Sequence, residues 1–265
     1  MIQTSEAKLE DWFNDHEGSL TAFSGGVDSA LVLFLTRRYL GANGVGVISD
    51  SSSLKRSDLA IAKSFCRNHD ITLRVIHTRE LENPEYAANP VNRCFHCKST
   101  LYTDLLQLRG EYPGHVLLNG TNADDFGDYR PGIKAAEINA IRSPLAECSL
   151  GKNQIRELAQ HFDLEVWDKP ASPCLSSRIP YGQEVTVEKL RQIEEAEQIL
   201  AEAGFSQCRV RHLNGLARIE VPTANLPGLR SKLDALSPRL RQLGFSSVEA
   251  DEEGLVSGKL NRAML

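Results

Sequence analysis

Six residues near the start of the chain combine glycines with hydroxyl and carboxylate side chains: Ser24-Gly25-Gly26-Val27-Asp28-Ser29. The apolar run Leu20 to Phe23 before them predicts a buried strand, and the run Ala30 to Leu40, stopped by Gly41, predicts a buried helix. A turn of small residues at a helix N-terminus leaves backbone N–H groups available to an anion, with the helix dipole behind them. The sequence therefore predicts an anion-binding loop in which Asp28 can hold a metal. An ordinary capped turn is the alternative, and the Walker A spacing is absent.

Cysteines form the second group that could do chemistry. Cys94 and Cys97 are spaced so that both sulfurs could reach one metal ion, but two ligands do not close a site. Cys174 lies in a proline-broken stretch in which Lys169 and Arg178 would favour its thiolate. Three thiolates without an obvious fourth partner are typical of an iron–sulfur cluster with one open iron.

Two other interpretations of these cysteines remain open. Structural zinc normally takes four protein ligands, and His96 would be the fourth. A redox disulfide between Cys94 and Cys97 is less favoured, because no thioredoxin-like context surrounds the pair. The N-terminal segment, with Glu6 and Glu10, does not resemble a signal peptide, and six cysteines in such a chain favour a reducing compartment. We therefore expect a cytoplasmic protein.

Carboxylates follow two of the predicted strands. Asp50 comes after the apolar run Val45 to Ile48 and could accept a hydrogen bond from a ribose or an adenine amine, with helix capping as the alternative. The stretch Gly120-Thr121-Asn122-Ala123-Asp124-Asp125 follows the run Val116 to Leu118. Carboxylates repel phosphate unless a hard cation lies between them, so these acids predict Mg²⁺ beside the phosphates of a nucleotide. Solvated turn acids are the alternative.

Strands and helices that would position these groups alternate along the chain. Strands are expected at residues 20–23, 45–48, 73–76 and 116–118 and just before Arg142, and helices at residues 5–15, 30–40, 55–68, 98–109 and 151–162. This alternation predicts an α/β fold with a doubly wound parallel sheet. In such sheets ligands bind beyond the carboxyl ends of the strands, which is where the polar groups fall.

The pattern changes near residue 182, so we predict a first domain at residues 1–182 and a small α+β domain at residues 183–265 that could form an oligomer contact. Thr186 caps the first helix of the second domain. Glu197 falls within the apolar stripe of that helix, where a carboxylate needs a partner.

A hairpin with a two-residue Asn-Gly turn is predicted over residues 209–221. Its register places Arg211 opposite Arg218 and Arg209 opposite Glu220. Two facing arginines repel, and an anion, or the carboxylate of the preceding helix, would remove that cost. A solvated charged face is the alternative interpretation.

Bulk composition excludes two classes of partner. The formal net charge is −5, which gives no global electrostatic reason to bind nucleic acid. No segment reaches the 18 apolar residues or so that a membrane span needs.

The hexapeptide at residues 24–29 resembles the pyrophosphate-binding loop of the ATP-pyrophosphatases, the PP-loop or adenine nucleotide alpha hydrolase-like enzymes, which split ATP into AMP and pyrophosphate to adenylate an oxygen. Motifs at residues 92–98, 120–125 and 172–182 narrow the resemblance to the LarE family of sulfur transferases, which act in nickel-pincer nucleotide cofactor synthesis. The resemblance implies a PP-loop fold and an enzyme that adenylates a carboxylate of pyridinium-3,5-biscarboxylic acid mononucleotide and converts it to a thiocarboxylate. It also implies a homo-oligomer, by family a hexamer.

Two branches of the family differ in their sulfur source. In one, the cysteine at the position of Cys174 gives up its own sulfur and becomes dehydroalanine. In the other, three cysteines hold a [4Fe-4S] cluster whose open iron carries a sulfide, which a sulfide donor must supply. This chain has Cys94, Cys97 and Cys174 together, as in the second branch.

The expected residues of the site follow from the motifs and the resemblance. ATP is expected to contact Ala22, Ser24, Gly25, Gly26, Asp28, Ser29, Asp50, Gly120, Thr121 and Asn122, with Mg²⁺ near Asp28 and Asp124. Catalysis is expected to involve Cys174, Asp28, Glu197, Arg209, Arg211, Lys98 and Arg178. Arg209 and Arg211 resemble the arginines of a phosphate or substrate site.

Three other functions stay open. A PP-loop tRNA-thiolating enzyme also combines this loop with three cysteines, but the acidic charge and the lack of a basic stripe disfavour it. A non-catalytic nucleotide sensor would give the three cysteines no role. An amidating synthetase is weaker still, because the chain has no glutaminase region.

Overall fold

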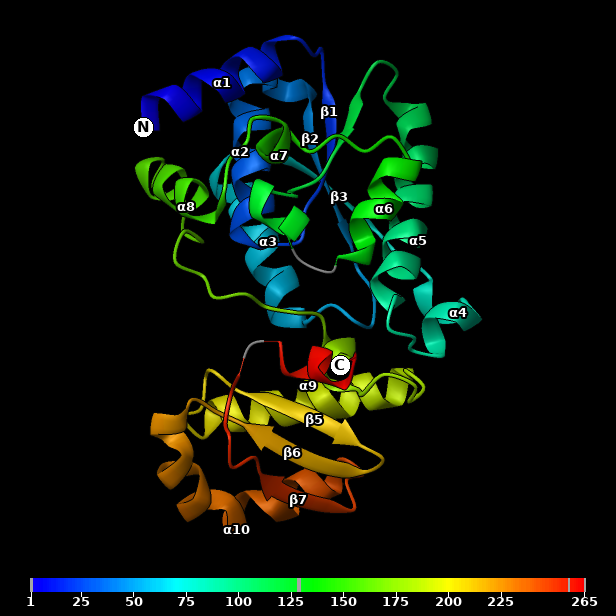
Figure 1. Ribbon diagram of the computed structural model, residues 1–265, viewed down its shortest axis with the longest axis vertical. Helices are drawn as coiled ribbons and strands as arrows, with labels where there is room; N and C mark the ends of the chain where they lie inside the picture. Colours follow the sequence, from blue (N-terminus) through cyan, green and yellow to red (C-terminus); the bar gives the residue numbers. More distant parts are fainter. Residues whose placement is uncertain (1, 128–129, 257, 265) are drawn as a thin grey trace. The chain divides into compact units, whose positions relative to one another are not determined.

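A computed structural model describes residues 2–127, 130–256 and 258–264, which divide into two compact units (Figure 1). The first unit is made of residues 1–80 and 92–172, and the second of residues 81–91 and 173–265. The chain therefore enters the second unit twice.

A four-stranded parallel sheet forms the centre of the first unit, in the order β3-β2-β1-β4. Its strands are β1 (Ser19–Ala22), β2 (Gly44–Ser49), β3 (Thr72–Ile76) and β4 (Val116–Leu118). Because the order runs outward from β1 in both directions, the loops after β1 and β4 meet where the direction of winding reverses. This confirms the doubly wound parallel sheet.

The predicted fifth strand is wrong. Arg142 makes one isolated parallel bridge with Leu118 and does not extend into a strand. Ala140 adopts a left-handed backbone conformation (φ 52°) just before it, and Pro144, which has no N–H to donate, begins the short helix α7 (Pro144–Glu147) just after. Too little extended chain remains for a ladder.

Helices cover both faces of this sheet (Figure 1). One face carries α1 (Ile2–Asn14), α2 (Val27–Leu40), α3 (Arg56–Asn68) and α8 (Lys152–His161). The other carries α5 (Arg93–Leu108) and α6 (Pro131–Ile138). Helix α2 is buried along most of its length, as its continuous apolar run predicts. Among the described residues, no helix combines the length and apolar character that crossing a bilayer requires.

The second unit is a three-stranded sheet with helices packed on it. Its elements are α4 (Pro84–Ala87), α9 (Val187–Glu202), β5 (Arg209–Leu213), β6 (Leu216–Glu220), α10 (Leu226–Gln242) and β7 (Ser247–Ala250). The hairpin register is confirmed, with Arg211 opposite Arg218. Val210 and Ile219 are fully buried in the core with residues of α9 and α10, so the arginines of the hairpin lie on its other face. The Thr186 cap is also confirmed, since its hydroxyl accepts from the Lys189 N–H at 3.2 Å.

The boundary expected after Gly182 differs from this division, which assigns residues 173–182 to the second unit. The side-chain amide of Asn89 donates to the carbonyls of Ile179 and Pro180 at 3.3 and 2.7 Å, and the Gly182 N–H donates back to the Asn89 carbonyl at 2.9 Å. These long-range hydrogen bonds hold the stretch around Cys174 to the segment 81–91, a pairing that local composition does not encode.

A buried histidine makes the stability of the second unit depend on pH. His212 is buried beside Phe245, its Nε2 lies 3.0 Å from Oε1 of Gln192, and burial, with Lys189 nearby, lowers the pKa of its imidazole. The unfolded chain therefore takes up the proton first as pH falls below the ordinary histidine value near 6.5, so stability declines from there toward the folded pKa.

We expect the His212→Gln variant to lose this part of the decline. Urea unfolding of both proteins at several pH values between 5 and 8 measures the difference. The wild-type and variant free energies of unfolding should run parallel above pH 7 and converge below it. Curves that stay parallel throughout would contradict the assignment.

Candidate active site

The loop after β1 is closed by its own hydroxyls. The Ser24 N–H donates to Oγ of Ser29 at 3.2 Å, the two serine oxygens lie 3.0 Å apart, and the Ser29 hydroxyl donates to the Gly26 carbonyl at 3.1 Å. Gly25 takes a left-handed conformation (φ 74°), which glycine adopts without strain. The loop thus leads into the N-terminus of α2, as predicted, and forms a seat for an anion.

The turn after β4 packs directly against this seat. A Cβ placed on Gly120 would lie 2.6 Å from the Ser29 nitrogen, so only glycine permits the approach. Oδ1 of Asn119 accepts from the Thr121 N–H at 2.9 Å and from the Ser143 hydroxyl at 2.8 Å, which fixes the turn. The structure thus brings Gly120 and Thr121 to the loop, where the sequence predicted them.

Two carboxylates lie close together at this edge. Burial raises the pKa of the Asp28 carboxyl above its ordinary value, and neighbouring Asp125 raises it further, while Lys152, the Asn122 amide and Arg130 oppose the shift. Asp125 is buried and lies 3.0 Å from the Arg130 guanidinium. Oxygens of this kind, together with the phosphates of a nucleotide, suit Mg²⁺ because that ion takes one or two carboxylates and leaves its other positions to phosphate and water.

Asp124 and Asp50, both predicted for this site, already have protein partners. Asp124 accepts from the Lys152 N–H at 2.7 Å and so caps the first turn of α8. Asp50 forms an ion pair with Arg56 at the start of α3. Asp125, and not the predicted Asp124, is the acid whose charge acts on Asp28, and the Asp-Asp doublet was the available signal.

Cys94 and Cys97 lie within a helix, whereas the sequence predicted that the helix follows them. Helix α5 begins at Arg93, earlier than residue 98, so Cys94 and Cys97 both lie in its first two turns. Residues three apart on a helix share a face, and the helix N-terminus favours thiolates. Cys94 is exposed and Cys97 half-buried, whereas Cys174 is exposed and belongs to the second unit. Lys98 follows on α5 with its Nζ 5.9 Å from the centre of the Tyr102 ring.

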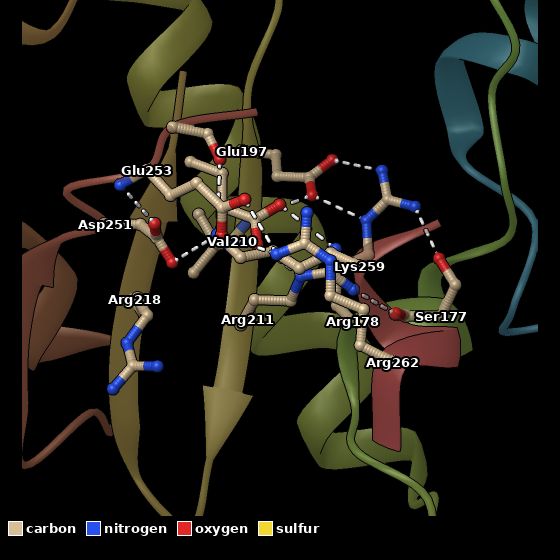
Figure 2. A network of polar contacts seen from close by, with 12 residues as sticks. Ser177, Arg178, Glu197, Val210, Arg211, Arg218, Asp251, Glu253, Lys259 and Arg262 are labelled. Atoms are coloured by element: carbon tan, nitrogen blue, oxygen red, sulfur yellow. Dashed lines mark hydrogen bonds and ion pairs between the residues drawn. The ribbon is translucent and has the colours of Figure 1, made fainter. Parts of the chain in front are cut away.

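In the second unit a buried arginine organises the stretch around Cys174. Arg178 is 1% exposed, and its guanidinium pairs with Glu197 at 2.8 Å (Figure 2). The same guanidinium donates to the carbonyls of Pro173 and Cys174 at 2.7 and 3.2 Å and to the Ser177 hydroxyl at 2.9 Å. Arg178 therefore holds the backbone of Cys174 in place through hydrogen bonds to carbonyl groups.

This pair corrects an expectation. The sequence predicts a hairpin arginine as the charge partner of Glu197, but the partner is Arg178. From the hairpin, the Glu197 carboxylate accepts a hydrogen bond from the Val210 N–H at 3.1 Å. Arg211 instead pairs with Glu220 at 2.9 Å and donates to the Ser177 carbonyl at 2.6 Å. The repulsion expected between facing arginines is thus removed by carboxylates of the protein, since Arg218 pairs with Glu249 at 2.5 Å.

Lys259, in the C-terminal segment, adds a positive charge beside the carboxylates of the second unit. Nζ of Lys259 lies 2.7 Å from Asp251 and 3.4 Å from Glu253 (Figure 2). It also lies 3.6 Å from Glu220. Glu220, 1% exposed, therefore has two cationic neighbours. Buried carboxylates need such partners, because burial otherwise penalises their charge.

Arg209 differs from its neighbours. Burial lowers the pKa of its guanidinium, and the nearby Arg178 and Arg211 lower it further. The carboxylates of Glu220 and Glu197 act in the opposite direction, but among the described residues none forms an ion pair or hydrogen bond with this half-buried side chain. The two neighbouring guanidinium groups outweigh the two carboxylates in this shift, so an anion bound beside Arg209 would be stabilised.

The parallel sheet and the Ser-Gly-Gly-Val-Asp-Ser loop at the end of β1 define a PP-loop ATP-pyrophosphatase type of α/β fold. The chain is 32% identical, over 98% of its length and 95% of the relative's, to the pyridinium-3,5-bisthiocarboxylic acid mononucleotide synthase of Lactiplantibacillus plantarum. It therefore belongs to the LarE family, of which that synthase is a member.

The chain is also similar to two other kinds of protein. The chain is 41% identical over 100% of its length to an uncharacterised protein of Synechocystis, of which it covers 99%. Weaker similarity, 26% identity over 70% of the chain and 55% of the relative, connects it to one of the subunits of the glutamine-hydrolysing GMP synthase of Saccharolobus islandicus. No family model matches the chain.

Proposed function

We propose that this protein is an ATP-dependent sulfur transferase that converts a carboxylate of pyridinium-3,5-biscarboxylic acid mononucleotide into a thiocarboxylate. Similarity over nearly the whole chain to a synthase of the bisthiocarboxylic acid mononucleotide carries the proposal. The loop after β1 supports it, because its backbone suits pyrophosphate.

The first step of the proposed reaction is adenylation. The substrate carboxylate attacks the α-phosphorus of ATP, and pyrophosphate leaves into the N–H groups of residues 24–29, which stabilise its charge. Asp28 and Asp125 would hold Mg²⁺, which would screen the phosphates from these carboxylates. The acyl-adenylate is then attacked by sulfur, which releases AMP and leaves the thiocarboxylate.

Cys94, Cys97 and Cys174 are the residues that would hold a [4Fe-4S] cluster. Their thiol donors suit iron, and the first two share one face at the start of α5. Among the described residues no group of three His, Cys, Asp or Glu side chains is assembled as a metal site, and Cys174 belongs to a different unit from the other two. When bound, the cluster would supply an open iron that carries the sulfide.

Donation of sulfur by Cys174 itself is the second route, favoured by its exposure. Its thiolate would attack the acyl-adenylate to give a thioester. Elimination would then break the Cβ–S bond, leaving the sulfur on the product and dehydroalanine in the chain.

Arg209 is the residue proposed to bind the substrate from the second unit. Its half-buried guanidinium lies beside two other arginines, whose charges a phosphate or carboxylate would help to balance. Arg211, bound to Glu220, would help through its charge and the position it gives to Ser177.

An anaerobic assay tests the proposal. Protein, ATP, Mg²⁺, a sulfide source and the mononucleotide should give AMP, pyrophosphate and a thiocarboxylate product, and omission of the mononucleotide should suppress all three. A brown protein whose broad absorbance is lost in Cys97→Ala supports the cluster, whereas a colourless, active protein that loses the mass of H₂S on turnover supports donation by Cys174. Absence of pyrophosphate release would contradict adenylation.

A further inference from the structure

The loop that receives pyrophosphate carries no cation of its own. The lysine that follows the glycines in a Walker A loop has no counterpart between residues 24 and 29. A lysine from much later in the chain reaches the loop instead. Nζ of Lys169 donates to the carbonyl of Gly25 at 2.9 Å across a sequence separation of 144 residues.

Lys169 is itself held in place. Its ammonium pairs with Asp58 of α3 at 3.0 Å, and the side chains of both residues are mostly buried. Asp58 also accepts from the Ser172 hydroxyl at 2.8 Å. The Arg156 guanidinium, from α8, donates to the carbonyls of Trp167 and Lys169 at 3.0 and 3.4 Å and so anchors the backbone that carries the lysine.

The contact between Lys169 and the Gly25 carbonyl sets the orientation of the peptide that joins Gly25 to Gly26. In a trans peptide the C=O and the following N–H point in opposite directions, so a carbonyl turned toward Lys169 turns the Gly26 N–H away from it. That N–H donates to Oγ of Ser24, an exposed side chain, at 3.4 Å, a long hydrogen bond that an anion would replace. A peptide between two glycines has little steric resistance to flipping, so an external contact must fix it.

We propose that Lys169 is a positioning residue for the pyrophosphate loop: it holds the Gly25 carbonyl so that the Gly26 N–H is presented to the leaving pyrophosphate. This rests on the proposed function, in which the loop receives pyrophosphate. Because Asp58 balances the charge of the ammonium, orientation of the peptide is the main contribution. Without Lys169 the loop must order its peptide each time an anion binds.

Calorimetric titration with inorganic pyrophosphate and Mg²⁺ tests this role without requiring turnover. We expect Lys169→Met to weaken pyrophosphate binding by about tenfold to a hundredfold, the range for losing a hydrogen bond that involves a charged group. AMP, which lacks the pyrophosphate, should bind within about twofold of wild type. Lys169→Arg, which keeps a charged donor, should restore most of the affinity.

Lys63→Met is the matched control, since Lys63 is an exposed residue of α3 in the same unit. It should bind pyrophosphate like wild type. If the methionine variant does not fold, Lys169→Gln enters the same comparison. Equal pyrophosphate affinity in wild type and a folded Lys169 variant would overturn this inference and leave the proposed function standing. Equal weakening of pyrophosphate and AMP would overturn it too, and failure of wild type to bind pyrophosphate would overturn both.

Discussion

The Cys174→Ser variant is expected to form no thiocarboxylate while still releasing pyrophosphate. A serine hydroxyl at neutral pH is neither a competent nucleophile nor a good iron ligand, so both proposed sulfur routes end at the acyl-adenylate. We expect the rate of thiocarboxylate formation to fall below about a thousandth of wild type. Mass spectrometry of the mononucleotide product measures the sulfur transfer that is lost. A coupled pyrophosphate assay measures the adenylation that is retained.

Cys148→Ser is the control for this experiment. Cys148 is half-buried and donates weakly to the Lys8 carbonyl at 3.6 Å, away from the proposed chemistry. Its replacement should change neither product. Thiocarboxylate formed by Cys174→Ser at more than a few per cent of the wild-type rate would contradict any direct role for Cys174. Loss of pyrophosphate release in that variant would show instead that Cys174 supports adenylation.

Replacing Arg178 by methionine is expected to destabilise the second unit strongly. The variant leaves Glu197 buried and without its guanidinium, and it removes the donors to the Pro173 and Cys174 carbonyls. Breaking a buried ion pair by removing one partner costs about 3–5 kcal/mol. Urea unfolding monitored by circular dichroism measures the loss as a fall in the midpoint with little change in slope.

A double-variant cycle separates the charge from the packing. Arg178→Met combined with Glu197→Gln should be less destabilised than the sum of the single changes, because the buried carboxylate that lost its guanidinium is no longer charged. Arg191→Met removes an exposed arginine of α9 that pairs with Glu188 and Glu195, and it should not shift the midpoint measurably. Additive effects in the cycle would show that Arg178 and Glu197 do not stabilise each other.

Several features of the fold followed from short-range pattern alone. The continuous apolar run of α2, the alternation of strands and helices, and the Asn-Gly hairpin register depend on periodicities of two or 3.6 residues, which a sequence displays directly. The glycines and serines of residues 24–29 likewise predicted the loop, because a helix N-terminus after a strand is a local arrangement.

Local pattern predicted the wrong start for α5 and a fifth strand that does not form. The start of α5 was expected at residue 98, and the helix begins at Arg93, so the spacing of Cys94 and Cys97 is that of a helix face. The fifth strand was expected before Arg142, where Pro144 and the left-handed Ala140 leave only one bridge. Helix boundaries and edge strands depend on packing that local propensity does not contain.

In the loop after β1, the local sequence determines the turn and the tertiary fold determines its partners. Its residues and its backbone turn follow from six consecutive positions, whereas its lysine comes from 144 residues away and its acidic neighbour, Asp125, from the turn after β4. The partners of Glu197 and Arg211 were likewise set by folding. Charged side chains pair according to which buried surfaces come into contact, since desolvation makes an unpaired buried charge costly. The periodicity of the sequence does not show which surfaces these are.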